Sequence, residues 1–156
     1  MSSHETNMLC VVDTHVLVWY FIGSKRLNKK LKDKIDAILN QGGRLLVPTI
    51  VLAEALDISE KKRVVLDFAE MYRLIKEEAG FEIVGFGSEI FDVTMRLKGV
   101  KEIHDRIIVA TAKFYQVGIL TAVKGQQAFP ARAFKKTRRK PGQVAEDEVI
   151  DGYSEN

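Results

Sequence analysis

The chain has 156 residues, of which 46% are hydrophobic and 29% are charged, and its formal net charge is +3. These values suit one soluble globular domain with a sizeable core, and the mild charge permits an RNA or DNA partner without demanding one. The single cysteine, Cys10, excludes an internal disulfide and favours a reduced, cytoplasmic compartment. The lack of clustered cysteines and histidines argues against a structural zinc site.

The amino-terminal region predicts neither a signal peptide nor a membrane span. Residues 1–7, MSSHETN, lack the basic flank and the apolar region of a signal peptide. The apolar run over residues 8–23 is interrupted by polar residues at 13–15 and is too short to cross a bilayer. We therefore expect no association with a membrane.

The first part of the chain alternates between apolar runs of strand length and patterns of helical spacing. The expected elements are a strand over 8–12, a helix over 14–22, a helix over 27–40, a strand over 44–47 and a helix that starts at Pro48-Thr49. Two glycines, Gly42 and Gly43, provide the stop signal for the second of these helices.

The second part of the chain continues the alternation. The expected elements are a helix over 60–79, a strand over 81–86, a helix over 88–98 with Ser88 as N-cap, a helix over 104–116 and a strand over 118–123. The complete order is β-α-α-β-α-α-β-α-α-β. This order predicts an α/β fold, a three-layer sandwich with a mostly parallel central sheet.

The end of the chain differs in composition from the rest. Residues 135–140, KKTRRK, carry five basic side chains in six positions, and an acidic stretch follows Pro141 and Gly142. No hydrophobic periodicity is visible after about residue 135, so we expect a domain over 1–134 and a mobile charged tail over 135–156. The basic run could contact RNA phosphates or could simply be solvated.

Three acidic residues stand at the ends of apolar runs far apart in sequence: Asp13, Glu54 and Asp105. Converging carboxylates repel one another and are costly beside a core unless a cation or hydrogen bonds offset their charge. Ligands of an open parallel sheet bind outside the carboxyl ends of its strands, where Asp13 is expected. Asp105 reaches the same edge only if the helices over 88–116 cross back, so topology permits convergence without proving it.

If the three acids converge, Mg²⁺ or Mn²⁺ is the ion that fits best. Hard cations prefer oxygen ligands, and they activate water and offset transition-state charge in phosphodiester hydrolysis. Simpler explanations exist, because Asp13 could be a helix N-cap and Asp105 a first-turn helix acid. Glu54 is harder to explain in this way, since the apolar residues of LAEAL would half-bury it.

Three segments resemble the PIN-domain nucleases, and within them the VapC-like ribonuclease toxins of type II toxin–antitoxin systems. VVDTHVLVWYFIG at 11–23 is similar to the family's opening strand, Asp-Thr pair and apolar helix. VPTIVLAEAL at 47–56 is similar to its second segment, and HDRIIVATAKFYQVGILTA at 104–122 to its third. The resemblance spans roughly residues 8–130.

The resemblance implies a metal-dependent endoribonuclease that is often a homodimer and is often inhibited by a small antitoxin protein. By the same resemblance Asp13 and Asp105 would be the main ligands of Mg²⁺ or Mn²⁺, and Glu54 a further ligand or the base that orients water. All three would be catalytic.

One position departs from the family pattern. The family often has a fourth acid two residues after the threonine of the final strand, Thr121, and this chain has Val123 there. Valine cannot bind a metal ion, so we expect one ion rather than two. Glu102 could substitute if the helix carrying Asp105 begins early, or it could be a solvated loop acid.

Three further side chains are candidates for supporting roles at the site. Thr14 and Thr121 could hydrogen-bond a carboxylate or a metal-bound water. Arg106 could pair with a site acid, with a phosphate or with a surface partner.

Histidines and aromatic residues near the acids receive a plainer interpretation. His15 and His104 flank the acids, but no nucleophile for them to activate is visible, so we expect both to be non-catalytic. Trp19 and Tyr20 are expected in the core or in a dimer contact rather than stacked on bases.

Three alternatives to the ribonuclease stay open. A catalytically weak PIN module that binds RNA or a protein partner is favoured by Val123. A phosphoaspartate enzyme of the haloacid-dehalogenase kind needs a second acid two residues after the first, where this chain has His15. A DNA-directed flap-type nuclease would gather more acids near its motifs.

Overall fold

The computed structural model describes residues 8–122, which form four strands and six helices. The elements are β1 (Leu9–Val12), α1 (Thr14–Ile22), α2 (Lys29–Asn40), β2 (Arg44–Pro48), α3 (Thr49–Glu60), α4 (Phe68–Glu77), β3 (Phe81–Val84), α5 (Ser88–Arg96), α6 (Ile103–Tyr115) and β4 (Gly118–Leu120). The predicted order of elements is confirmed. The expectations for Val123 and for the tail over 135–156 concern residues outside the described range.

All four strands are parallel and lie in the order β3-β2-β1-β4. In the middle of the sheet, Val11 of β1 pairs with Leu46 on one side and with Ile119 on the other. Strands covered by helices on both faces need apolar residues on both faces, which explains the continuous apolar runs of β1, of β4 and of β2 after its exposed first residue, Arg44. The edge strand β3 is less buried and exposes Glu82.

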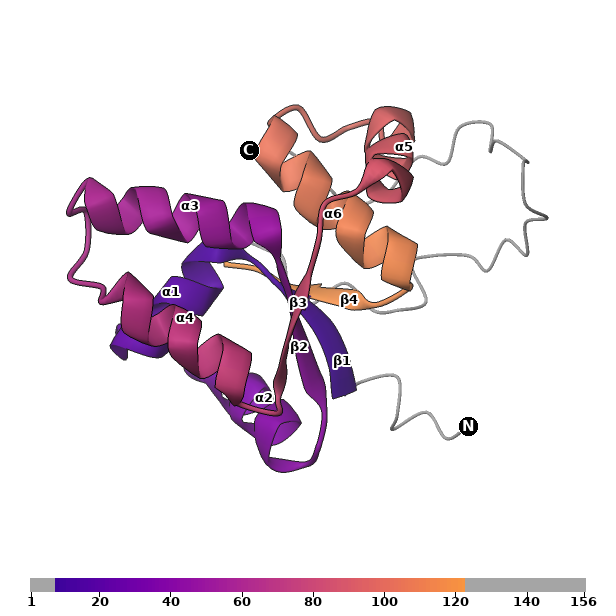
Figure 1. The fold of residues 1–156 in the computed structure, drawn as a ribbon. Coiled ribbons are helices and arrows are strands. Elements are labelled where there is room, and N and C mark those ends of the chain that lie inside the picture. The colour runs from indigo at the N-terminus through magenta and orange to yellow at the C-terminus, as the bar shows by residue number, and fades with distance from the viewer. Residues whose placement is uncertain (1–7, 123–156) are drawn as a thin grey trace.

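The chain reverses its direction across the sheet once. It moves from β1 to β2 and β3, and then returns to place β4 beside β1. Crossovers between parallel strands are almost always right-handed, so this reversal moves the last helix pair to the opposite face. Figure 1 shows α5 and α6 together on one side of the strands and α2 and α4 on the other. The result is the expected three-layer α/β sandwich, with a topological switch point between β1 and β4.

The core fills both faces of the sheet. On one side, α2 buries Leu31, Ile35 and Ile38 at helical spacing. On the other side, α6 is buried over 107–112 because it packs between the sheet and α5. Within residues 8–122, no helix combines the length and the apolar character needed to cross a membrane.

The helix expected over 60–79 is shorter in the structure. Helix α3 continues as far as Glu60, and Lys62 then adopts a left-handed conformation with φ of 53°, which interrupts a right-handed helix. Helix α4 starts only after Asp67, whose side chain accepts a hydrogen bond from the Glu70 N–H at 3.1 Å. The apolar spacing over these residues does indicate a helix, but the start of that helix depends on this cap.

Smaller shifts affect the elements on either side of α5. Strand β3 ends at Val84 because its partner β2 ends at Pro48, where α3 takes over. The N-cap of α5 is Gly87, and Ser88 is the first helical residue. Helix α6 begins one residue earlier than expected, which makes Glu102 its N-cap.

Candidate active site

Asp13 stands at the switch point, directly after β1. Its backbone N–H donates to the carbonyl of Leu120 in β4 at 2.9 Å, so the chain is fixed where the two strands end. One carboxylate oxygen accepts from the Thr14 N–H at 2.6 Å and caps α1, and the other accepts from the Thr121 hydroxyl at 2.9 Å. Asp13 is therefore an N-cap, and its carboxylate also joins the ends of β1 and β4.

Glu54 lies in the second turn of α3 and is half-buried. Its carboxylate accepts a hydrogen bond at 3.1 Å from the hydroxyl of Thr14, a residue that is only 2% exposed. Thr14 thus donates its N–H to Asp13 and its hydroxyl to Glu54. Asp13 and Glu54, which are far apart in sequence, are thus linked through one buried residue.

Asp105 lies in the first turn of α6 and is also half-buried. Its N–H donates to the Glu102 carboxylate at 2.8 Å. Helix α6 precedes the parallel strand β4 and packs on α3, on α5 and on β1. Its first turn therefore lies at the edge where β1 ends, which is the condition for convergence that the sequence left open.

The charges of the three acids act on one another. Burial raises the pKa of Glu54, and the negative charges of Asp13 and Asp105 add to the increase, while the Thr14 hydrogen bond and His104 oppose it. Burial likewise raises the pKa of Asp105, helped by Asp13 and Glu102 and opposed by the two neighbouring histidines. The site is therefore a region where negative charge is unfavourable unless a cation is present.

The donor chemistry of these acids fits a hard divalent cation. Carboxylate oxygens are the ligands that Mg²⁺ and Mn²⁺ prefer, and a cation would relieve the repulsion that adds to the effect of burial on the two pKa values. The side chains of residues 8–122 do not, however, stand as an assembled cluster of three or more acidic, histidine or cysteine ligands. The acids lie at the same edge of the sheet and are close enough for their charges to interact, but their side chains do not form a complete set of metal ligands.

Glu102 and Arg106 organise the start of α6. The Glu102 carboxylate caps the helix and lies 3.0 Å from Nδ1 of His104. Although Glu102 is exposed, the loss of some surrounding water acts to raise its pKa, and hydrogen bonds from the backbone N–H groups of Asp105 and His104 outweigh this and hold the pKa below its usual value. The Arg106 guanidinium donates to the carbonyls of Val100 at 2.9 Å and Lys101 at 3.3 Å. Its hydrogen bonds thus fasten the preceding loop.

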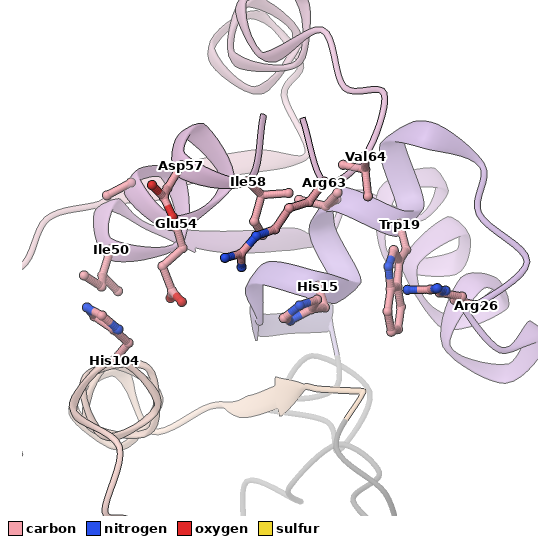
Figure 2. Close-up of a pocket in the computed structure, with 12 residues that line it drawn as sticks. His15, Trp19, Arg26, Ile50, Glu54, Asp57, Ile58, Arg63, Val64 and His104 are labelled. Atoms are coloured by element: carbon pink, nitrogen blue, oxygen red, sulfur yellow. The ribbon is translucent and has the colours of Figure 1, made fainter. Parts of the chain in front are cut away.

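A pocket of about 530 Å³ opens beside the acids, between α1 and α3 (Figure 2). Glu54 and His104 line it, and Asp13 and Asp105 do not. The pocket also contains Arg26 and Arg63, which sequence reasoning did not select. The sequence did contain one indication of their role: each arginine follows shortly after a helix that carries a candidate site residue.

Trp19 has a second environment that the sequence did not predict. It packs against the core, as expected, but it also lines the pocket. His15 lies beside it, with ring centroids 5.6 Å apart, and lines the same pocket.

Comparison with known proteins identifies the family of the chain. No curated protein matches the sequence. The PIN domain matches it over residues 10–128, which is more than half of the 156 positions and includes all three acids. PIN domains are generally nucleases that act on RNA, and they typically use divalent metal ions. The chain belongs to the PIN domain family.

Proposed function

We propose that this protein is an endoribonuclease that hydrolyses RNA phosphodiester bonds with one bound Mg²⁺ or Mn²⁺. The observation that carries the proposal is the placement of Asp13, Glu54 and Asp105. They come from three distant segments of a PIN domain, and the pKa values of Glu54 and Asp105 are both raised, first by burial and then by the negative charge of Asp13. Half-buried carboxylates that repel a neighbouring acid are typical of a cation site.

Each residue has its own role in this proposal. Asp13 and Asp105 would be the main ligands of the ion. A bound Mg²⁺ or Mn²⁺ supplies Lewis-acid chemistry, which offsets negative charge on the phosphate and makes water easier to deprotonate. Glu54, with its raised pKa, orients the attacking water and accepts its proton. The hydroxyls of Thr14 and Thr121 hold Glu54 and Asp13 in place.

The VapC-like toxin role is a further part of the proposal. It rests on the three sequence segments at 11–23, 47–56 and 104–122 that resemble those toxins. It includes a homodimer, a cytoplasmic location and a small antitoxin protein as inhibitor. A gene for a small DNA-binding protein immediately upstream, whose product co-purifies with this chain and suppresses its cleavage of RNA, is the expected finding. An isolated gene with no such neighbour would argue against this role.

A catalytically weak PIN module is the second candidate function. Val123 favours it, because the fourth acid of many relatives is replaced by an apolar residue. In that case the domain would bind RNA or a protein partner without cutting.

Cleavage of RNA by the wild type and by Asp13→Asn separates the two functions. Asparagine is as good an N-cap as aspartate, so the variant keeps α1 capped while it loses the negative charge. The ribonuclease predicts cleavage by the wild type that requires Mg²⁺ or Mn²⁺, stops with EDTA, and falls at least about 100-fold in the variant. Equal residual cleavage by both proteins would mean contamination and would contradict the proposal.

A further inference from the structure

The pocket between α1 and α3 is a groove with two walls. Ile50, Glu54 and Asp57 line it from positions i, i+4 and i+7 of α3, which share one helix face. The other wall is a face of α1 that presents His15 and Trp19. The volume of about 530 Å³ lies within the range of roughly 300–1,000 Å³ that ligand sites occupy.

The ends of the groove differ in charge. Figure 2 shows Glu54 and His104 at one end, Trp19 and Arg26 at the other, and Arg63 directed into the space between them. Both arginines, Arg26 and Arg63, are exposed. A ligand that enters from the arginine end therefore approaches the candidate catalytic acids with a cationic guanidinium group along its path.

Both arginines are presented by anchored turns. After α1, the Arg26 N–H donates to the Ser24 hydroxyl at 3.2 Å, and the next residue, Leu27, is buried. After α3, the Arg63 N–H donates to the carbonyl of Ile58 at 3.3 Å. The fold therefore defines the backbone positions of both arginines, while their side chains can adjust to a ligand.

The charge of the groove favours an anionic ligand at its basic end. Asp57 lies in the groove, but its carboxylate is paired with Lys61 at 2.8 Å. An arginine guanidinium matches the geometry of a phosphate, to which it can donate two parallel hydrogen bonds. The indole of Trp19 offers a flat surface of the kind on which unpaired bases stack.

We propose that this groove binds the single-stranded RNA segment that flanks the scissile phosphate. Arg26 and Arg63 contact its phosphates, and Trp19 stacks against one of its bases. The inference rests on the proposed ribonuclease function and adds the route by which substrate reaches Glu54. The strand is single because stacking on Trp19 requires a base that is not paired within a duplex.

Trp19 is the only tryptophan of the chain, so its fluorescence reports on the groove directly. The probe is a pool of short single-stranded RNAs of random sequence, titrated at low salt in EDTA so that metal-dependent cleavage does not interfere. We expect saturable quenching of the tryptophan emission at the RNA concentrations that also raise the anisotropy of a labelled pool. The same pool annealed to its complement is expected to quench much less.

Substitutions test each contact separately. Arg26→Gln and Arg63→Gln are each expected to weaken RNA binding several-fold and to lower the slope of log affinity against log salt by about 0.7. Trp19→Leu is expected to weaken binding by about 5- to 150-fold, and Trp19→Phe much less, both measured by anisotropy with folding checked by circular dichroism. Arg44→Gln is the matched control, since Arg44 begins β2 at the opposite edge of the sheet.

Two results would overturn the inference. One is RNA binding with unchanged tryptophan emission and with equal affinity for Arg63→Gln and Arg44→Gln. The other is the absence of RNA binding at low salt. If an acidic peptide quenched the emission of Trp19 and RNA did not, the groove would be a site for a protein partner, which would equally contradict the inference. A failure of the proposed ribonuclease function would give another pattern of results. RNA would quench the emission of Trp19 and the arginine variants would bind RNA more weakly, but the wild type with Mn²⁺ would not cleave RNA.

Discussion

Thr14 is the residue on which the arrangement of the acids depends most. Its backbone N–H donates a hydrogen bond to the Asp13 carboxylate, its hydroxyl donates one to Glu54, and the residue is almost completely buried. The hydrogen bond also lowers the pKa of Glu54 against the effects of burial and of the neighbouring charges. One small side chain thus couples the position and the protonation of the proposed base.

Thr14→Val tests this coupling. Valine has a similar shape but removes the hydroxyl, so we expect cleavage to fall about 10- to 100-fold, as for other residues that position metal ligands. Stability is expected to fall by about 1 kcal/mol. Thr94→Val is the matched control, because the Thr94 hydroxyl is also buried and donates at 2.8 Å to the carbonyl of Ile90 in α5. A loss of activity as large in Thr94→Val, or activity in Thr14→Ser as low as in Thr14→Val, would contradict the coupling.

The raised pKa of Asp105 predicts a pH-dependent effect on stability. An acid whose folded-state pKa lies above its unfolded value makes folding less favourable once it ionises. This cost is absent below the unfolded pKa of about 3.9 and fully present above the folded pKa. Asp105→Asn should therefore raise the Tm of the metal-free protein at pH 7, and the difference should shrink as the pH falls toward 4.

Glu89→Gln is the control for Asp105→Asn. Glu89 lies in the first turn of α5 as Asp105 does in α6, so both substitutions remove a favourable interaction with a helix dipole. At Asp105, burial and the neighbouring acids Asp13 and Glu102 also raise the pKa. A Tm in EDTA that drops equally in both variants would show that the repulsion at Asp105 has no effect on stability.

At the scale of elements, side chains that accept hydrogen bonds determine where the helices begin. Asp13, Asn28, Asp67 and Glu102 each cap a helix. The sequence predicted each of the six helices of residues 8–122, but it placed the start of α4 too early and chose Ser88 for a cap that is Gly87. Caps are local contacts of one side chain with one N–H group, so periodicity does not reveal them.

Glu102 provides the test at this scale. As the N-cap of α6 it should tolerate Glu102→Gln, because the amide oxygen can still accept from the Asp105 N–H. Glu102→Ala should cost about 0.5–2 kcal/mol, the usual range for loss of a cap. Thermal unfolding and RNA cleavage of both variants check this. A Glu102→Gln protein that is stable but as inactive as Asp13→Asn would show instead that Glu102 replaces the missing fourth acid.

At the scale of the whole molecule, the return of the chain to place β4 beside β1 creates the site. It brings Thr121 to Asp13 across a sequence separation of 108 and sets the first turn of α6 at the same edge. The sequence predicted the order of strands and helices, and it singled out the three acids as candidates for the site. It could not predict the strand order β3-β2-β1-β4, because that depends on long-range pairing. The groove with Arg26 and Arg63 was missed for the same reason, since it requires α1 and α3 to pack together.

Metal binding should stabilise the whole domain, since an ion that binds only the folded state shifts the unfolding equilibrium. At an Mn²⁺ concentration 100 times the dissociation constant, the expected gain is about 2.7 kcal/mol. Thermal unfolding of the wild type should therefore move to a higher temperature with Mn²⁺ and back with EDTA. Asp13→Asn should show little response, and Asp33→Asn, at a solvent-exposed acid of α2, should respond like the wild type.

A crystal structure with Mn²⁺ bound tests most directly whether Asp13, Glu54 and Asp105 serve one cation. The anomalous signal of manganese locates the ion without assumptions about its ligands. The predicted result is a single ion at the carboxyl edge of β1, with carboxylate oxygens of Asp13 and Asp105 at about 2.1 Å and Glu54 turned toward it or toward one of its waters. An ion bound elsewhere, or carboxylates of Asp13 and Asp105 that remain more than about 10 Å apart in the presence of Mn²⁺, would contradict a shared metal site.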